Sequence, residues 1–301
     1  MAVAIPYRRD LKFEYGAVGT LSPLIRRVIC RNPSAFTFHG TGTYIVGRGK
    51  VAVIDPGPDD PAHVAALADA LRGETITHHM ITHTHRDHSP ATAALQRQAG
   101  GKSYGFGPHG SGRQGGVHDQ VEEGGDMAFR PDVTVRDGDV IEGDGWTLEA
   151  VYTPGHTSNH VCYALKQEKV LFPGDHVMGW STTIVSPPDG DMLAYMTSLE
   201  KLLRRDDARY WPTHGPAIDE PRAFVAALIE HRRDRERQIL ACLKDGVGQI
   251  PAMVKVMYAD VNPGLHGAAA RSVLAHLIHM VDTGRVACDS EPRLGASYRL
   301  P

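Results

Sequence analysis

Four residues of types that bind metal ions lie within six consecutive positions of the chain. Segment 83–88 reads HTHRDH and follows a short apolar run. Residues i and i+2 of an extended strand project to the same side, so His83 and His85 can hold one ion. The turn that follows can direct Asp87 and His88 toward a second ion. Imidazole suits zinc, and a carboxylate adds charge to hold another divalent cation, so the spacing predicts a two-ion site.

Three further residues of the same types recur downstream, each after a strand-like apolar segment. They are His156 in YTPGHT (152–157), Asp175 in FPGD (172–175) and His214 in WPTHG (211–215). Each stands beside Gly or Pro, and glycine lets the backbone approach a crowded centre. The alternative, a polar surface loop at 83–88 with coincidental histidines, does not explain this recurrence. Together the seven residues form a complete set of donors for two ions.

Two divalent ions that share a water lower its pKa to about 7, which supplies an attacking hydroxide without a protein nucleophile. Asp87 is predicted to be catalytic because it can both bind an ion and hold the proton of that water. His160 is a second catalytic candidate, as a proton donor or as a contact to a phosphate or carboxylate. The alternative for His160 is a packed, hydrogen-bonded strand histidine.

The elements that must position these residues are short strands and helices. Hydrophobic periodicity and Gly, Pro or Asp punctuation predict strands at 43–46, 51–54, 80–82, 133–135, 146–152, 160–165 and 169–172, and helices at 60–72, 91–99 and 191–204. The metal-binding types follow strand ends, where rigid scaffolds commonly carry catalytic groups. Strands and helices alternate through residue 220, which indicates an α/β layered domain.

Several other polar residues have two interpretations each. Asp55 ends a predicted strand and could accept a ring N–H from a ligand histidine, or it could be a turn residue that bonds its own backbone. His78 and His79 are assigned to a helix-to-strand connection. Residues 100–125 contain ten glycines and are predicted to be a long irregular flap. His109 and His118 in this flap are predicted to be solvated loop histidines, with contact to substrate as the alternative.

The sequence changes character near Pro221, where we place a domain boundary between 1–220 and 221–301. Amphipathic patterns predict helices at 221–241, 250–259 and 266–283, with a short β pair around 285–287 and 298–300. Four arginines, Arg232, Arg233, Arg235 and Arg237, could meet a phosphate backbone. Acidic residues are interleaved with them, so a solvated helix face with ion pairs is the stronger interpretation. The domain would then serve packing or homodimer formation.

Composition narrows the class of protein. Of 301 residues, 42% are hydrophobic and 22% charged, which is ordinary globular usage and excludes fibrous or low-complexity classes. A net charge of −3 favours neither nucleic acid nor a membrane surface as partner. The four cysteines form no CxxC pair, which excludes a thiolate zinc knuckle. No apolar run approaches the roughly 20 residues that span a bilayer, so we expect a cytoplasmic protein without membrane contact.

The ordered motifs resemble those of the metallo-β-lactamase superfamily over residues 32–215. The resemblance implies an αββα sandwich with two metals at one edge of two packed sheets. It implies a first metal on His83, His85 and His156, a second on Asp87, His88 and His214, and Asp175 as the bridge. True metallo-β-lactamases use Cys or Ser at the position of Asp175, whereas glyoxalase II and ribonuclease Z use Asp. Antibiotic hydrolysis is therefore disfavoured as the main role.

A narrower resemblance rests on NPSAFT (32–37), GTGTYIVG (40–47), IDPG (54–57) and the tail 231–240. These segments are similar to the β-lactamase-like protein 2 group, which carries a small winged-helix domain after the hydrolase domain. The resemblance implies the same arrangement here, with a mainly helical C-terminal domain. That group includes an endoribonuclease of single-stranded RNA.

The sequence therefore predicts a dinuclear hydrolase that directs a metal-bound hydroxide at an ester, thioester, lactone or related bond. Zinc is the expected metal, with iron or manganese as alternatives, because the same nitrogen and oxygen donors accept all three. A small molecule is the expected substrate. The alternatives are a metal-dependent endoribonuclease that acts on RNA, β-lactam hydrolysis, and a metal-bound module without turnover.

Overall fold

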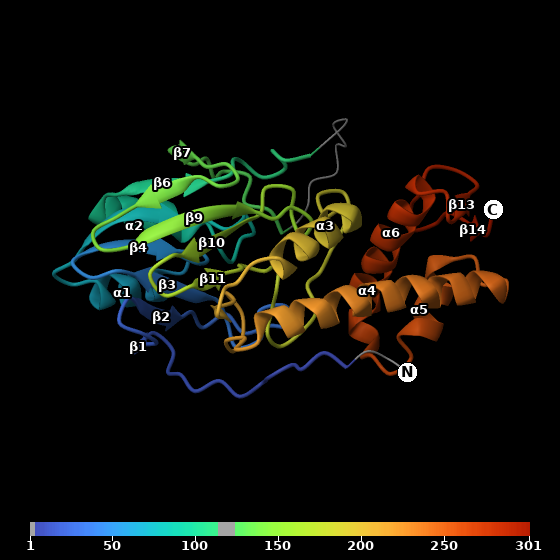
Figure 1. The fold of residues 1–301 in the computed structure, drawn as a ribbon, viewed down its shortest axis with the longest axis horizontal. Helices are drawn as coiled ribbons and strands as arrows, with labels where there is room; N and C mark the ends of the chain where they lie inside the picture. The colour runs from blue at the N-terminus through green and yellow to red at the C-terminus, as the bar shows by residue number, and fades with distance from the viewer. Residues whose placement is uncertain (1–3, 114–123) are drawn as a thin grey trace.

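The computed structural model describes residues 4–113 and 124–301, and two packed β-sheets with helices on both outer faces form its main body (Figure 1). Side chains alternate along the strands, so each sheet has two apolar faces to bury. Tyr44 and Val46 join residues such as Trp146 and Tyr163 in the core between the sheets. Ile45, which lies between Tyr44 and Val46, points to the other face and packs against helices. The predicted α/β sandwich is confirmed.

The first sheet has seven strands in chain order. They are β1 (Val18–Thr20), β2 (Ile25–Ile29), β3 (Gly42–Val46), β4 (Lys50–Ile54), β5 (Thr75–Met80), β6 (Lys102–Gly105) and β7 (Val133–Thr134). Strands β1 to β4 are antiparallel, and β4 to β7 are parallel. Helices α1 (Pro61–Ala70) and α2 (Ala91–Ala99) supply the crossovers between parallel strands and cover the outer face.

The second sheet has five strands in the order β12-β11-β10-β9-β8. Their bounds are β8 (Val140–Glu142), β9 (Thr147–Tyr152), β10 (Val161–Leu165), β11 (Val170–Phe172) and β12 (Arg209–Tyr210). Helix α3 (Met192–Leu203) and the first half of α4 (Pro221–Lys244) pack on its outer face through residues such as Leu199 and Leu228. Strand ends from both sheets thus meet at one edge of the sandwich.

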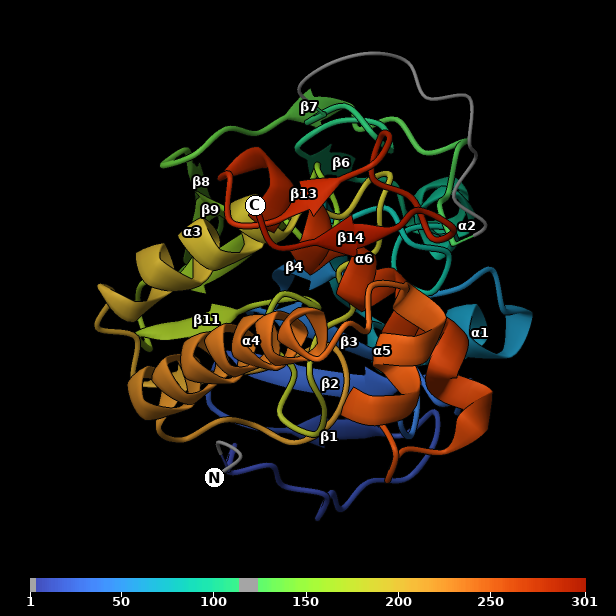
Figure 2. The ribbon, with the colours of Figure 1, turned by 90° about the vertical axis from the view of Figure 1, so that its right-hand side faces the viewer.

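The C-terminal region is mainly helical. After α4 come α5 (Ile250–Met257), the 3₁₀ turn η1 (Pro263–Leu265), α6 (His266–Asp282) and the strand pair β13 (Ala287–Cys288) and β14 (Tyr298–Arg299) (Figure 2). The three predicted helices and the β pair are confirmed. Helix α4 serves two cores, because its second half packs with α5 and α6 in a separate apolar cluster. No helix in residues 4–113 and 124–301 is long and apolar enough to cross a membrane.

Some predicted elements were wrong in extent. The strand predicted at 80–82 is β5, Thr75–Met80, and it includes His78 and His79, which we had assigned to a connection. Parallel pairing with β4 and β6 on its two sides explains the longer strand. The predicted irregular loop at 100–125 begins with strand β6, and its His118 lies outside the described residues. The prediction missed β1, β2, β8 and β12, of which three have only two or three residues.

Candidate metal centre

The seven predicted donors meet where loops leave the strand ends of both sheets. Segment 83–88 follows β5, His156 lies between β9 and β10, Asp175 follows β11, and His214 follows β12. The backbone at Gly174, φ +52°, lies close to neighbouring side chains: a Cβ atom there would lie 2.7 Å from His160 Nε2. The Gly before Asp175 thus allows the approach that the sequence motif predicted.

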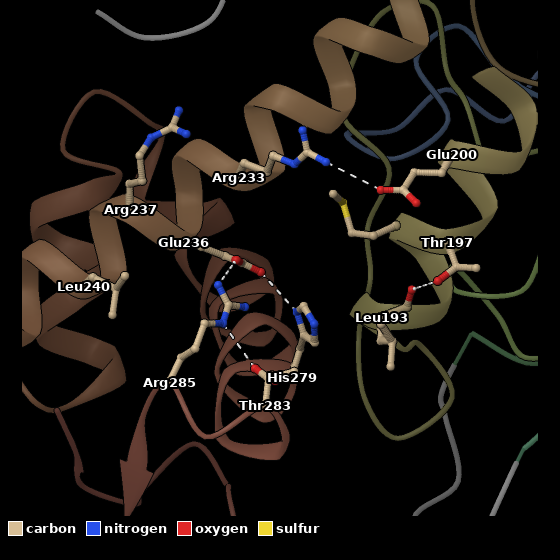
Figure 3. Close-up of a pocket in the computed structure, with 11 residues that line it drawn as sticks. Leu193, Thr197, Glu200, Arg233, Glu236, Arg237, Leu240, His279, Thr283 and Arg285 are labelled. Carbon is tan, nitrogen blue, oxygen red and sulfur yellow. Dashed lines mark hydrogen bonds and ion pairs between the residues drawn. The ribbon is translucent and has the colours of Figure 1, made fainter. Parts of the chain in front are cut away.

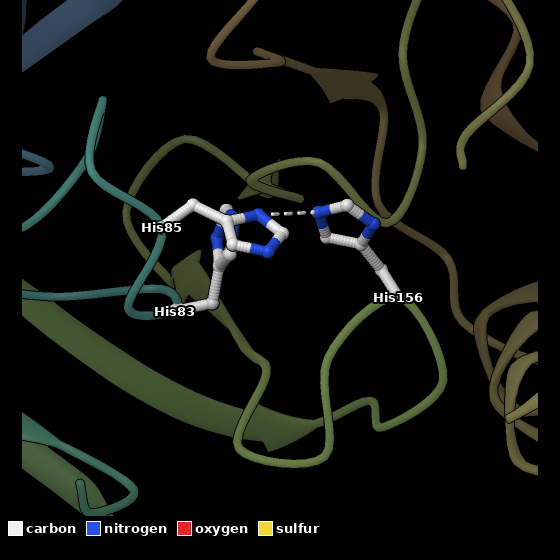
Figure 4. A group of neighbouring side chains, drawn as sticks. All are labelled: His83, His85 and His156. Carbon is white, nitrogen blue, oxygen red and sulfur yellow. Dashed lines mark hydrogen bonds between the residues drawn. The ribbon is translucent and has the colours of Figure 1, made fainter. Parts of the chain in front are cut away.

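Three imidazoles form the first group of candidate donors (Figure 4). His83 Nε2 lies 3.0 Å from His85 Nδ1, and His156 Nε2 lies 3.1 Å from the same atom. All three nitrogens therefore face a common point. Three imidazole nitrogens that converge in this way are a known set of protein ligands in catalytic zinc sites.

The second group of candidate donors consists of Asp87, His88 and His214. Asp87 Oδ2 lies 3.1 Å from His214 Nε2 and 3.6 Å from His88 Nε2. Asp175 stands between the two groups: its Oδ2 lies 3.6 Å from His88 Nε2, 3.4 Å from His214 Nε2 and 4.0 Å from His156 Nε2. One carboxylate thus faces donors from both groups.

The outward ring nitrogens of these histidines have oxygen partners that orient the rings. His156 Nδ1 lies 2.6 Å from Ile184 O, and His214 Nδ1 lies 3.2 Å from Gly40 O. His88 Nδ1 lies 2.9 Å from Asp55 Oδ2. A proton on Nδ1 in each ring leaves Nε2 with its lone pair directed inward, which is how such partners prepare histidine ligands for metal.

Asp55 is the hub of this support. Its carboxylate accepts hydrogen bonds from Thr82 N (2.8 Å), Thr82 Oγ1 (2.7 Å) and Thr213 Oγ1 (3.0 Å), in addition to its contact with His88. It is fully buried and has φ +49°. Of the two interpretations of Asp55, the contact with a candidate ligand histidine is therefore the one that the structure shows. Thr82 and Thr213 were not among the predicted site residues, although both stand next to a predicted ligand.

The electrostatics of the cluster reflect its crowding. Burial lowers the pKa of His83 well below its usual range, so this ring is neutral. Burial also lowers the pKa of His214, but Asp175 and Asp87 outweigh it and raise the value to about 10. His88 behaves in the same way beside Asp87 and Asp175. The carboxylates thus favour positive charge at this position.

The atoms that face inward fit a divalent cation. His88 Nε2, Asp175 Oδ1 and His214 Nε2 are buried and make no hydrogen bond of good geometry. Unsatisfied polar atoms are rare in protein interiors and call for a partner such as an ion. Imidazole nitrogens with carboxylate oxygens form a donor set that suits zinc and also iron or manganese.

The family model described as Metallo-beta-lactamase superfamily matches residues 37–214, which include all seven candidate donors. This chain belongs to the metallo-β-lactamase superfamily. A second family model, the beta-lactamase associated winged helix domain, matches residues 250–293, which hold α5 and α6. Both resemblances seen in the sequence are confirmed.

Known members of the superfamily match nearly the whole chain. The beta-lactamase-like protein 2 homolog of Drosophila melanogaster is 32% identical over 281 residues, 90% of this chain and 92% of its own. An atrochrysone carboxyl ACP thioesterase of Paecilomyces divaricatus is 32% identical over 256 residues, 83% of this chain and 74% of its own. The crystal structure of a beta-lactamase domain protein from Burkholderia ambifaria has the same fold, with a TM-score of 0.76, 19% identity and coverage of 97% and 96%.

His160 lies beneath the candidate donors of this superfamily member. Its side chain is fully buried, and its Nδ1 lies 3.0 Å from Thr153 Oγ1. The ring stacks on His83, with 5.1 Å between centroids. Burial lowers the pKa of His160 well below its usual range. These contacts describe a packed, hydrogen-bonded histidine, and its predicted catalytic role stays a prediction.

His109 is not the solvated loop residue that the sequence suggested. Its side chain is only 2% exposed, and its Nδ1 lies 2.9 Å from Thr84 Oγ1. Asn159 holds the surrounding segment in place, because its Nδ2 donates to Thr84 Oγ1, Gly107 O and Pro108 O. Glycine content predicted a loop here, but not that the β9–β10 connection would bind it.

A separate cavity of about 550 Å³ lies between α3, α4 and α6 (Figure 3). It is lined by Leu193, Met196, Thr197, Glu200, Arg233, Glu236, Arg237, Leu240, His279, Thr283 and Arg285. Its charged groups pair with each other or with close neighbours: Arg285 with Glu236 at 2.6 Å, and Arg233 with Glu200 at 3.5 Å. None of the candidate metal donors lines this cavity.

The arginine-rich stretch of α4 is largely a solvent-accessible face, and two of its four arginines, Arg233 and Arg237, form the ion pairs that the sequence predicted. Arg237 pairs with Glu230 at 2.8 Å, and Arg235 stacks on Tyr258 at 4.4 Å. Arg232 is the exception, because it is buried with 3% exposure. The sequence pattern did not distinguish Arg232 from its neighbours.

Proposed function

We propose that this chain is a dinuclear metal-dependent hydrolase that cleaves an ester, thioester, lactone or related bond in a small-molecule substrate. One observation carries the proposal: two groups of three donors lie side by side, and Asp175 faces both. A single structural ion would need only one closed group of ligands. Superfamily membership adds support, because the matched region contains both groups.

The donor geometry supports the following assignment. His83, His85 and His156 would hold one ion, Asp87, His88 and His214 the other, and Asp175 would bridge them. Zinc is the metal that we propose, since imidazole dominates the donor set, and iron or manganese would use the same atoms.

The chemistry then divides between the ions and Asp87. When bound, two divalent ions supply water activation near neutral pH and polarise the oxygen of the scissile bond. Burial raises the pKa of Asp87, but His88 and His214 outweigh burial and keep the carboxyl ionised at neutral pH. Its side chain is 27% exposed, whereas that of Asp175 is 11% exposed. Asp87 is therefore the carboxylate that can accept a proton from the attacking water.

The bond type is supported by the relatives. Among the similar chains are two atrochrysone carboxyl ACP thioesterases, which are 29% and 32% identical. The paired arginines of α4 do not favour an RNA substrate, because Arg233 and Arg237 already contact carboxylates. We therefore propose thioesters and related acyl compounds before RNA. Homodimer formation and cytoplasmic location stay predictions.

Metal analysis tests the centre. The protein, purified without chelators, is expected to carry two divalent ions per chain, and Asp175→Ala is expected to lose at least one. The absence of bound metal, together with no binding of added zinc, iron or manganese, would overturn the assignment.

A substrate panel tests the reaction. We would compare thioesters, lactones, phosphodiesters, a β-lactam and single-stranded RNA, with Asp87→Ala as the matched blank. Turnover of a thioester or lactone that the blank lacks supports the proposal. Turnover of RNA alone, lost in the blank, would assign the chain to the endoribonuclease alternative instead. RNA cleavage that survives in the blank would be contamination.

A further inference from the structure

Arg232 on α4 is a buried cation without a carboxylate partner. Its exposure is 3%, and no Asp or Glu in residues 4–113 and 124–301 lies within ion-pair distance of it. The neighbouring Arg233 is 54% exposed and pairs with Glu200. Burying a cation without an opposite charge is costly, and a neutral side chain would pack in its place at lower cost. The position therefore calls for a specific use of the guanidinium.

The contacts of Arg232 lead to one short segment. Its Nη2 donates to the backbone carbonyl of Thr183, a residue 49 positions earlier in the chain. Its Nη1 donates to Ser272 Oγ on α6 at 3.4 Å, and its guanidinium lies 5.1 Å from the centre of the Tyr195 ring. The guanidinium thus contacts a carbonyl, a hydroxyl and an aromatic face, while its Nε is buried without a hydrogen bond. The carbonyl belongs to the loop after Asp175.

The segment that Arg232 holds, Thr183–Ile184, in turn holds two candidate donors. Ile184 O accepts the hydrogen bond from His156 Nδ1 at 2.6 Å. Thr183 Oγ1 donates to Asp175 O at 2.7 Å and lies 3.0 Å from His176 O. Tyr195, beneath the guanidinium, also donates from its hydroxyl to His176 O at 3.1 Å. The segment thus sets both the ring orientation of His156 and the backbone position of Asp175.

We propose that Arg232 is a positioning residue of the metal centre, which acts on His156 and Asp175 through Thr183–Ile184. The inference rests on the proposed function, because it takes these two residues as ligands. It means that α4 and α6 belong to the support of the centre and are not only an appendage. Partners that orient a metal ligand typically contribute about 10–100-fold in metal affinity.

The test makes the same substitution at two adjacent arginines of α4. Arg232→Met and Arg233→Met each remove one guanidinium, and only the first contacts Thr183. Zinc affinity is measured in the full-length protein by competition with a chromophoric chelator, and kcat and KM are measured at limiting and saturating zinc. We expect zinc affinity to fall about 10–100-fold in Arg232→Met, with kcat recovered at saturating zinc, and no change in Arg233→Met. Arg232→Lys, which keeps a donor, is expected to lie between.

The outcomes separate the inference from the proposed function. Wild-type protein that binds no metal would overturn the proposed function. Wild-type protein that binds two ions, with Arg232→Met unchanged in affinity, would overturn only the inference. A purely structural role would lower the melting temperature of Arg232→Met without changing the zinc affinity of the folded protein.

If Arg232→Met does not fold, Thr183→Val decides the question. This change removes the hydroxyl that contacts Asp175 O and His176 O, and it keeps the volume of the side chain nearly constant. Reduced zinc affinity in Thr183→Val supports the role of the segment, and wild-type affinity overturns it.

Discussion

Two clusters of ionisable side chains differ in how their charges are arranged. In the candidate metal centre, Asp87, Asp175 and the ligand histidines direct their polar atoms at common points, and several of these atoms lack a hydrogen bond. In the cavity between α3, α4 and α6, acids and bases pair side by side, as Glu236 does with Arg285 and His279. Convergent atoms without partners mark a place for a ligand, whereas paired charges mark a place that is already satisfied.

The two clusters therefore differ in the partners of their polar atoms. Both clusters contain carboxylates and histidines. The outward nitrogens of His88, His156 and His214 contact Asp55 or a backbone carbonyl, and these contacts fix the orientation of the rings. In the cavity, Glu236 instead contacts Arg285 and His279 directly.

The largest expected effect comes from Asp87. Asp87→Ala should lower kcat by about 10²–10⁴-fold, because it removes a donor and the acceptor of the water proton. Glu236→Gln, the matched carboxylate from the cavity, should leave kcat unchanged. Steady-state kinetics with saturating metal measures both. Equal losses in the two variants would remove the distinction between the clusters.

Asp55→Ala should have the next largest effect. The loss of the carboxylate that orients His88 is expected to weaken metal binding by about 10–100-fold. Chelator competition measures the affinity, and Asp69→Ala, which removes an exposed carboxylate paired with Arg72, is the control. An unchanged affinity in Asp55→Ala would show that the threonines around Asp55 orient the site without it.

Acid should destabilise the fold through His276, a buried residue of α6. Burial lowers the pKa of this histidine from its ordinary value of 6.5 to about 4. The fold therefore accommodates the neutral ring, which is the dominant form at pH values above 6.5. As the pH falls from about 6.5 to 4, the unfolded chain binds the proton first and the free energy of unfolding drops by roughly 1–3 kcal/mol. Urea unfolding followed by circular dichroism at several pH values measures the slope.

His276→Gln should flatten this pH dependence. Part of the slope remains in the variant, because burial also lowers the pKa of His231 to about 3 and that of His63 to about 4. The same acid slope in His276→Gln and wild type would contradict the prediction.

Glu236→Gln should lower the stability of the fold by a small amount and leave the metal centre unaffected. Its carboxylate is 12% exposed and contacts Arg285 and His279, so its neutralisation is expected to cost about 1–2 kcal/mol of unfolding free energy. Glu230→Gln, from an exposed pair with Arg237, is the control and should show no measurable change. Zinc affinity should stay at the wild-type level in both. A change in zinc affinity would link the cavity to the metal centre.

The local parts of the fold were largely predictable. Helical periodicity placed α2 at its observed bounds, 91–99, and located α4, α5 and α6, because helix pattern depends on neighbours three and four positions away. Short strands such as β8 and β12 were missed, since two or three residues carry too little pattern. Strand β5 was predicted too late in the chain, because His78 and His79 interrupt its apolar pattern. Pairing with β4 and β6 stabilises this strand in spite of them.

The candidate donors were also predictable one by one, but their environment was not. Spacing in 83–88 and the motifs around His156, Asp175 and His214 identified residues of the right type at strand ends. The burial of His109 and the hub at Asp55 depend on contacts between distant segments, such as Asp55 with Thr213, 158 positions apart. Composition and spacing contain no information about such pairs.

Residue type and short-range spacing are enough to identify the side chains that can bind metal and to predict that strands and helices alternate around them. Which of these residues face one another, and what holds them there, depends on contacts between segments that are distant in the sequence. Arg232 and Arg233 show the reason: they are adjacent and identical in type, but the turn of the helix buries one beneath the loop of Asp175 and leaves the other in water.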